Sequence, residues 1–187
     1  TSKRTGLSNE TARLEASTPG ASRSVSATLS TRRRVGTPDG RYSESAGDPG
    51  GPMSFALVAH TADVAVEATG ETLDRTFEAA AAGLSAAHCE SIPETGDRFG
   101  LSVAAESPEA LLFDYLDELI YQRDVRGVLP TDHRVRISDD ARPSLEASAR
   151  AVPLSDVDAR EIKAVTYSEM ALERAASGWR AYVVFDV

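Results

Sequence analysis

Residues 107–123 read SPEALLFDYLDELIYQR, and this stretch predicts the most regular helix of the chain. Ser107 suits the N-cap position, and Pro108 suits the first helical position, where a missing amide hydrogen does no harm. Apolar residues recur every three or four positions and predict one broad buried face, made of Leu111, Leu112, Tyr115, Leu116, Leu119 and Ile120. The opposite face carries the acidic residues Asp114, Asp117 and Glu118.

A second helix and a set of strands are predicted around this stretch. Residues 72–88 place Leu73, Phe77, Ala80, Leu84 and Ala87 on one apolar stripe. Alternating or short apolar runs predict strands at Ser54–His60, Val64–Ala68, Arg98–Val103, Val135–Ile137, Leu145–Ala151, Ile162–Leu172 and Trp179–Phe185. The last two strands are joined by a predicted hairpin loop at residues 175–178. The pattern predicts an α+β fold in which two helices pack on one face of a mixed, largely antiparallel sheet.

The composition divides the 187-residue chain near residue 52. Ser, Thr, Gly and Pro supply 27 of the first 52 residues, and large apolar residues are few there. Such a segment buries too little apolar surface to offset its ordering entropy, so residues 1–52 are predicted to be a disordered tail. Alternatively, Met53 is the natural start and the tail is an upstream extension. Residues 53–187 are predicted to form one domain.

Charge and composition exclude several classes of protein. The formal net charge is −9, and residues 53–187 contain 24 acidic and 12 basic residues. This balance argues against a protein that holds nucleic acid mainly through its own phosphate contacts. The sequence contains no apolar run long enough for a transmembrane helix, so no membrane partner is expected. A single cysteine, Cys89, excludes an intramolecular disulfide framework.

Three short clusters contain residues that could bind a metal ion or take part in chemistry. The first is His60-Thr61-Ala62-Asp63, the second surrounds Lys163, and the third is the final pair Asp186-Val187. The carboxylates of Asp63, Asp186 and the chain end at Val187 would together form an all-oxygen site suited to Ca²⁺, Mg²⁺ or Mn²⁺. The alternatives are simple turn chemistry at the first cluster and a solvated chain end at the third. Spacing does not decide between them, because 122 residues separate Asp63 from Asp186.

Other residues of reactive types are interpreted as structural. His88 and Cys89 are interpreted as the end of a helix with a small buried thiol. His133, beside Asp132, is interpreted as a loop residue. The sequence contains neither a phosphate-binding glycine loop nor a Gly-x-Ser-x-Gly nucleophile motif.

Four motifs in the same order and spacing resemble the archease family over residues 55–187. They are His60-Thr61-Ala62-Asp63-Val64, Leu111-Leu112-(x)₃-Leu116-Asp117-Glu118-Leu119, Ile162-Lys163-Ala164-Val165-Thr166-Tyr167 and Val184-Phe185-Asp186-Val187. Two positions differ from many members, which have Gly where Ala65 stands and His where Ser168 stands. Neither is a metal ligand in the family, so the differences affect local geometry or partner contacts.

The resemblance implies a function and a site. Archeases are small α+β proteins that help an RtcB-type RNA-splicing ligase to become guanylylated and to turn over repeatedly in tRNA splicing. The resemblance implies metal ligands at Asp63, Asp186 and Val187, with calcium as the associated metal. Lys163 and His60 are expected beside the bound ion as cofactor-binding residues.

The resemblance also predicts what the chain itself does not do. It implies a cytoplasmic, non-catalytic activator that meets tRNA exon halves only indirectly, through the ligase. Two alternatives remain open at the level of sequence. One is a metal-dependent hydrolase or nuclease that uses the same carboxylates to activate water. The other is a general chaperone-like interaction module whose ion only stabilises the fold.

Overall fold

The computed structural model describes residues 51–59, 63–138 and 142–187. The described elements are β1 (Met53–Ala59), β2 (Asp63–Gly70), α1 (Leu73–His88), β3 (Arg98–Ala104), α2 (Pro108–Arg126), β4 (Val128–Ser138), β5 (Ser144–Pro153), β6 (Ala164–Ala175) and β7 (Gly178–Asp186). A short 3₁₀ turn, Leu154–Asp156, follows β5. Residues 1–50 and His60 lie outside the described residues, so the disordered tail and the role of His60 stay predictions.

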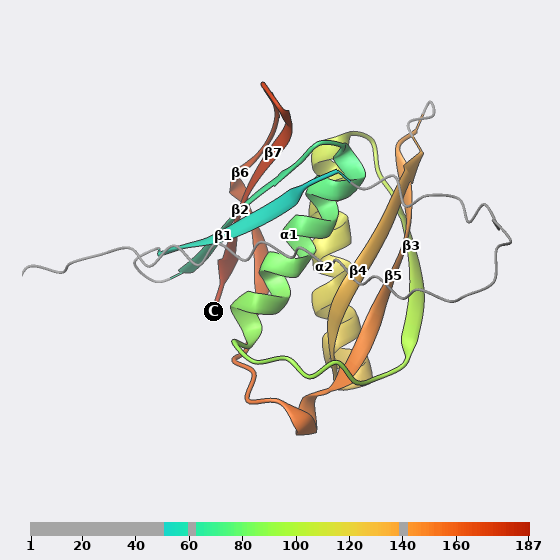
Figure 1. Ribbon diagram of the computed structural model, residues 1–187, viewed down its shortest axis with the longest axis vertical. Coiled ribbons are helices and arrows are strands. Elements are labelled where there is room, and N and C mark those ends of the chain that lie inside the picture. The colour runs from blue at the N-terminus through green and yellow to red at the C-terminus, as the bar shows by residue number, and fades with distance from the viewer. Residues whose placement is uncertain (1–50, 60–62, 139–141) are drawn as a thin grey trace, which may run out of the picture.

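The two helices lie between two antiparallel sheets (Figure 1). One sheet has the strand order β1-β2-β7-β6, and the other has the order β3-β5-β4. Every described pairing is antiparallel. The α+β fold class is confirmed, and the strands divide into two sheets where the sequence pattern indicated a single mixed one.

The composition of α1 explains why a sheet covers each side of the helix pair. Besides the predicted stripe, α1 buries Ala79, Ala81 and Ser85, so most of its circumference is covered. These small side chains allow close approach on several sides at once. At Gly83 an added Cβ would lie only 2.4 Å from Val66 Cγ1 of β2, so a larger residue there would push the helix off the sheet.

The predicted ends of α2 are confirmed at the N-terminus and extended at the C-terminus. The Ser107 hydroxyl accepts a hydrogen bond from the Ala110 amide at 3.1 Å, and Pro108 occupies the first turn. The helix ends at Arg126 and is capped by Gly127, whose φ of 64° is left-handed, a conformation that glycine adopts without a Cβ penalty. The described part of the chain contains no helix with the length and apolar character needed to cross a bilayer.

Two carboxylates of α1 hydrogen-bond to β4, an edge strand of the three-stranded sheet. Asp74 Oδ1 accepts from the Ile137 amide at 3.0 Å, and Glu78 Oε1 accepts from the Val135 amide at 2.9 Å. The second oxygen of Glu78 pairs with Arg75 Nη1 at 2.7 Å. Glu78 is therefore buried with both oxygens bonded, as a buried carboxylate requires.

Candidate metal site and its surroundings

The first residue of β2 and the last residue of β7 meet at one end of the four-stranded sheet. Asp63 and Asp186 are direct partners in the antiparallel register, and Ala164 of β6 pairs with Asp186 from the other side. Figure 1 shows the chain end, marked C, at this end of the molecule. Two residues that are separated by 122 others in the sequence thus lie opposite each other on adjacent strands.

Lys163 joins the same cluster from the segment that leads into β6. Its backbone amide donates to the Asp186 carbonyl oxygen at 2.9 Å. Its Nζ donates to the Val187 oxygen at 2.9 Å. The side chain of Val187 packs against the main hydrophobic core. Core packing and Lys163 together fix the position of the Val187 oxygen next to the aspartate pair.

The chemistry of this cluster suits a hard cation. Side chains of directly opposed residues share one face of a sheet, with Cβ atoms about 5 Å apart, and like charges in that position repel. Asp186 is exposed and Asp63 is partly buried, so both side chains can reach an ion from solvent. Carboxylate oxygens, together with an oxygen of Val187, are ligands that Ca²⁺, Mg²⁺ and Mn²⁺ prefer.

The cluster offers only two acidic side chains among the described residues. Within residues 51–59, 63–138 and 142–187, no location gathers three or more His, Cys, Asp or Glu side chains in a metal-binding arrangement. A third protein ligand would therefore be the Val187 oxygen, as the family resemblance implies, with water completing the shell.

An arginine on the same sheet face neutralises a neighbouring acid. Arg180 of β7 contacts Glu67 of β2 at 3.0 Å and Glu173 of β6 at 2.7 Å. The hydrogen bond from Arg180 lowers the pKa of Glu67 from its usual value. Glu67 follows Asp63 by four residues, so both lie on one face of β2. No local sequence pattern indicates this role of Arg180, because its two partners lie on two other strands, β2 and β6.

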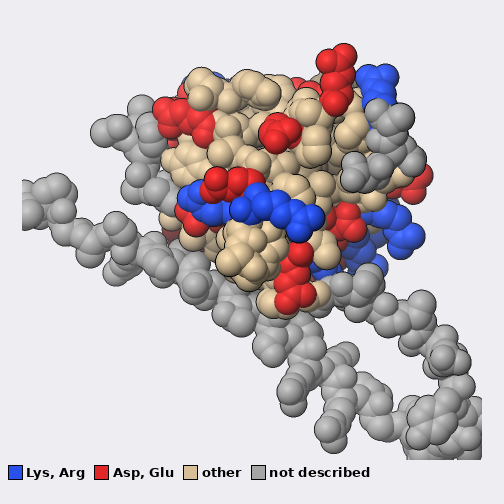
Figure 2. All heavy atoms as spheres, turned by 90° about the horizontal axis from the view of Figure 1, so that it is seen from above, with Lys and Arg blue, Asp and Glu red and all other residues tan. Residues whose placement is uncertain are grey.

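The opposite end of the molecule carries charges of both signs. Figure 2 shows that end with acidic and basic side chains interspersed over its surface. The acidic excess of the chain is not gathered there into a patch of one sign.

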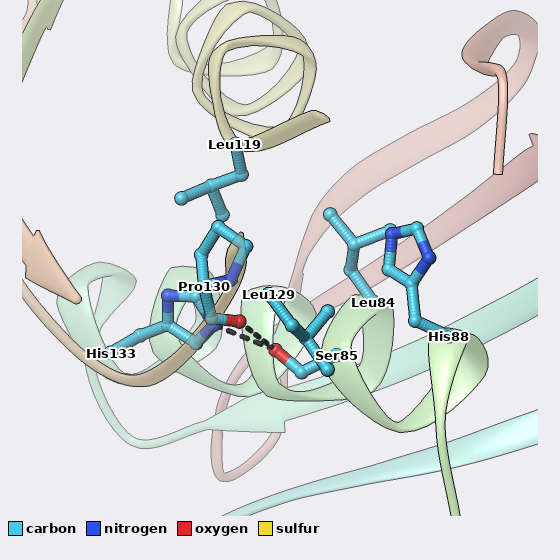
Figure 3. A pocket seen from close by; sticks show the side chains of 7 residues that line it. All are labelled: Leu84, Ser85, His88, Leu119, Leu129, Pro130 and His133. Carbon is cyan, nitrogen blue, oxygen red and sulfur yellow. Dashed lines mark hydrogen bonds between the residues drawn. The ribbon is translucent and has the colours of Figure 1, made fainter. Parts of the chain in front are cut away.

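A second group of polar residues lies in the core between α1 and β4. The Ser85 hydroxyl lies 2.8 Å from the Pro130 carbonyl oxygen and 2.9 Å from His133 Nε2 (Figure 3). The Tyr115 hydroxyl lies 3.5 Å from His133 Nδ1. One consistent arrangement has Nε2–H donating to Ser85, Ser85 donating to Pro130, and Tyr115 donating to Nδ1. Each group then has a partner.

This Ser–His pair resembles a nucleophile and base but is not placed to act as one. Ser85 and His133 are buried, and the space in Figure 3 is closed in by Leu84, Leu119 and Leu129. Burial lowers the pKa of His133 to about 3. A neutral imidazole with so low a pKa is a weak general base near neutral pH. The network is therefore structural.

The structure also tests the sequence interpretations of His133, His88 and Cys89. The interpretation of His133 as a loop residue is wrong, because His133 lies in β4. A register shift between Thr131 and Arg134, with a positive φ of 49° at Asp132, breaks the alternation there and hid the strand. His88 does end α1, and Cys89 is buried, as predicted.

These features define a class: small α+β proteins with two helices between antiparallel sheets and an oxygen-rich cluster at a strand end. A family model described as the Archease protein family matches residues 55–187. The chain therefore belongs to the archease family.

Individual relatives agree with this assignment. The archease of Pyrococcus furiosus is 33% identical over 135 residues, which cover 68% of this chain and 94% of that protein. A probable archease of Mycobacterium tuberculosis is 33% identical over 144 residues, which cover 76% of this chain and 79% of that protein. The solution structure of a Methanobacterium thermoautotrophicum protein superposes with a TM-score of 0.63 at 27% identity, covering 72% of this chain and 98% of that one.

A more distant structure supports the fold. An archease of Thermotoga maritima, described as a possible chaperone, superposes with a TM-score of 0.50 at 22% identity, covering 70% of this chain and 94% of that one.

Proposed function

We propose that this protein activates an RtcB-type RNA-splicing ligase by presenting a divalent cation held by Asp63, Asp186 and an oxygen of Val187. The observation that carries the proposal is the direct pairing of Asp63 with Asp186, with Lys163 bonded to both Asp186 and Val187. Calcium is the proposed metal, and Mg²⁺ or Mn²⁺ suits the same oxygens. The tRNA exon halves meet this protein only through the ligase.

The chain's own residues would act by position and charge. The β2–β7 ladder holds the backbones of Asp63 and Asp186 opposite each other, so their side chains are close together before the ion or the ligase arrives. Lys163 fixes the Val187 oxygen and leaves its second lone pair for another contact. The bound cation would supply a positive centre that helps the ligase accept guanylate. The protein can promote that step only by binding the competent state of the ligase better than the other.

The buried Ser85–His133 pair offers no Ser–His hydrolase, because it has no access to substrate. The metal-dependent hydrolase alternative uses the carboxylates instead, and cleavage of RNA or nucleotides by the purified chain with Mg²⁺ or Mn²⁺, without the ligase, would favour it. In the proposed function the protein is not itself an enzyme. It forms no covalent intermediate, and the ligase performs the joining reaction.

The test is reconstituted ligation of tRNA exon halves by the matching ligase under multiple-turnover conditions. Asp63→Asn and Asp186→Asn should each lower the stimulated rate at least tenfold, towards that of the ligase alone. Each should also weaken Ca²⁺ binding in calorimetric titration. Asp97→Asn, which removes an exposed charge before β3, is the matched control and should stimulate normally. Full stimulation by both Asp63→Asn and Asp186→Asn would refute the proposal.

A further inference from the structure

The outer face of α2 exposes apolar side chains that no described element covers. The four exposed large apolar residues of the described ranges are Met53, Tyr121, Val125 and Tyr167. Tyr121 and Val125 lie on α2 and are 56% and 57% exposed. Tyr167 of β6 is 58% exposed, and its ring meets Phe113 of α2 edge-on at 5.4 Å. Three of the four therefore lie on or against one helix.

Tyr121 and Val125 belong to a row of four side chains along α2. Phe113, Asp117, Tyr121 and Val125 follow one another at intervals of four residues, so each lies one turn beyond the last on neighbouring parts of the helix surface. The row spans about 18 Å at 1.5 Å per residue. We call this row, together with Asp114 and Tyr167, the α2 surface.

The α2 surface is acidic as well as apolar. Asp114 and Asp117 are exposed and form no ion pair with any residue in the described ranges. The buried Arg123 is paired with Asp124, so its charge is not offered at the surface. Exposed aromatic residues are enriched in protein–protein interfaces, and acidic residues beside them steer a partner of opposite charge towards the surface.

We propose that the α2 surface is the docking site for the basic face of the RNA ligase, a proposal that rests on the proposed function. An RNA-binding enzyme carries a positively charged surface, which complements Asp114 and Asp117. A second copy of this chain is disfavoured as the occupant, because two α2 surfaces would oppose like charges.

The position of Tyr167 connects this surface to the metal site. Lys163 immediately precedes β6, and Tyr167 lies in β6 four residues later. Four residues of extended chain span about 13 Å. A partner seated on Tyr167 and Phe113 is therefore close enough to meet Lys163 and the aspartate pair. The α2 surface would supply affinity, and the strand-end cluster would supply the ion.

The test measures binding and stimulation separately, with the full chain and the matching ligase. The apolar variant combines Tyr121→Ser with Val125→Ser, and the charge variant combines Asp114→Asn with Asp117→Asn. Met53→Ser is the control for the apolar variant, and Asp97→Asn is the control for the charge variant. All four change exposed side chains. Thermal unfolding of each variant checks that it folds.

The apolar variant should raise the dissociation constant for the ligase at least tenfold, mainly because the complex dissociates faster. The charge variant should slow association severalfold and reduce its dependence on salt. Both should lose stimulation at low protein concentration and regain it at high concentration, whereas Asp186→Asn should not regain it. Binding without stimulation by the wild type would leave the docking site standing and refute the proposed function.

Three results would overturn the docking site. The first is an apolar variant that binds the ligase as tightly as the wild type while stimulation is normal. The second is a wild-type chain that does not bind the ligase, which would end both proposals. The third is a wild-type chain that dimerises in sedimentation equilibrium while the apolar variant stays monomeric. That result would show that the α2 surface binds a second copy of this chain.

Discussion

The aspartate pair at the end of the four-stranded sheet and the Ser85–His133 pair in the core differ in access to solvent. Both consist of residue types that can perform chemistry, and both bring together distant parts of the chain. In the Ser85–His133 network each polar group has a protein partner, and the surrounding leucines leave no room for a ligand. At the strand end two like charges face each other in reach of solvent. Chemically capable groups that solvent can reach indicate function, whereas groups enclosed in the core and bonded to one another indicate stability.

The largest expected effect comes from breaking the buried network. His133→Ala should lower the free energy of unfolding by about 3 kcal/mol, because it leaves a cavity and removes the partner of two hydroxyl groups. Urea denaturation at neutral pH measures the change. Tyr115→Phe, which removes only the long hydrogen bond, is the milder comparison and should cost about 1 kcal/mol. A loss below about 1 kcal/mol for His133→Ala would contradict the structural role.

An intermediate effect is expected from acid. His133 has a folded-state pKa of about 3 against an ordinary value near 6.5, so between these values the unfolded chain binds a proton that the folded chain does not. Stability should therefore decrease as the pH falls below about 6.5, by about 1.4 kcal/mol per pH unit from this group. Burial also lowers the pKa of His88, which acts in the same direction.

Urea denaturation between pH 6.5 and pH 5 tests this, because most carboxylates keep their charge over that range. A His133→Gln variant should show a shallower slope, and the remaining slope includes the contribution of His88. Equal slopes in the variant and the wild type would show that His133 is not the group responsible.

The smallest effect is expected at the strand end, and its sign should be opposite. In the presence of a chelator, Asp186→Asn should leave stability unchanged or raise it by up to about 1 kcal/mol, because it removes a like charge opposite Asp63. With Ca²⁺ in excess, the wild type should gain stability through binding and the variant should gain little. Thermal unfolding with and without Ca²⁺ measures both differences. Equal stabilisation of the two proteins by Ca²⁺ would place the ion elsewhere.

The sequence predicts local features of this fold better than long-range ones. The capping of α2 follows from Ser107 and Pro108, since an N-cap depends on a few adjacent residues. The second sheet was not predicted, because the small residues of α1, such as Ala79 and Ala81, do not show by periodicity that the helix is covered on several sides. The contacts of Glu78 with β4 carry no sequence signal, since they depend on where a strand edge lies in space.

The candidate site shows the same limit. Asp63 and Asp186 could be named from motifs, but their adjacency depends on the strand order β1-β2-β7-β6, which no local pattern specifies. His133 shows the reverse case: a bulge at Asp132 disguised a strand residue as a loop residue. From the sequence, the exposed side of α2 could be recognised only by its acidic residues. The exposure of Tyr121 on that side is known only from the structure.

The carboxylates of Asp74 and Glu78 have a consequence for self-association. The outer amides of a sheet's edge strand are a template on which another chain can add a strand, which is a route to aggregates. Because Ile137 and Val135 already donate to α1, an incoming strand would have to displace a buried carboxylate before it could pair there. The side chains of α1 therefore hinder another chain from adding a strand to the three-stranded sheet at β4.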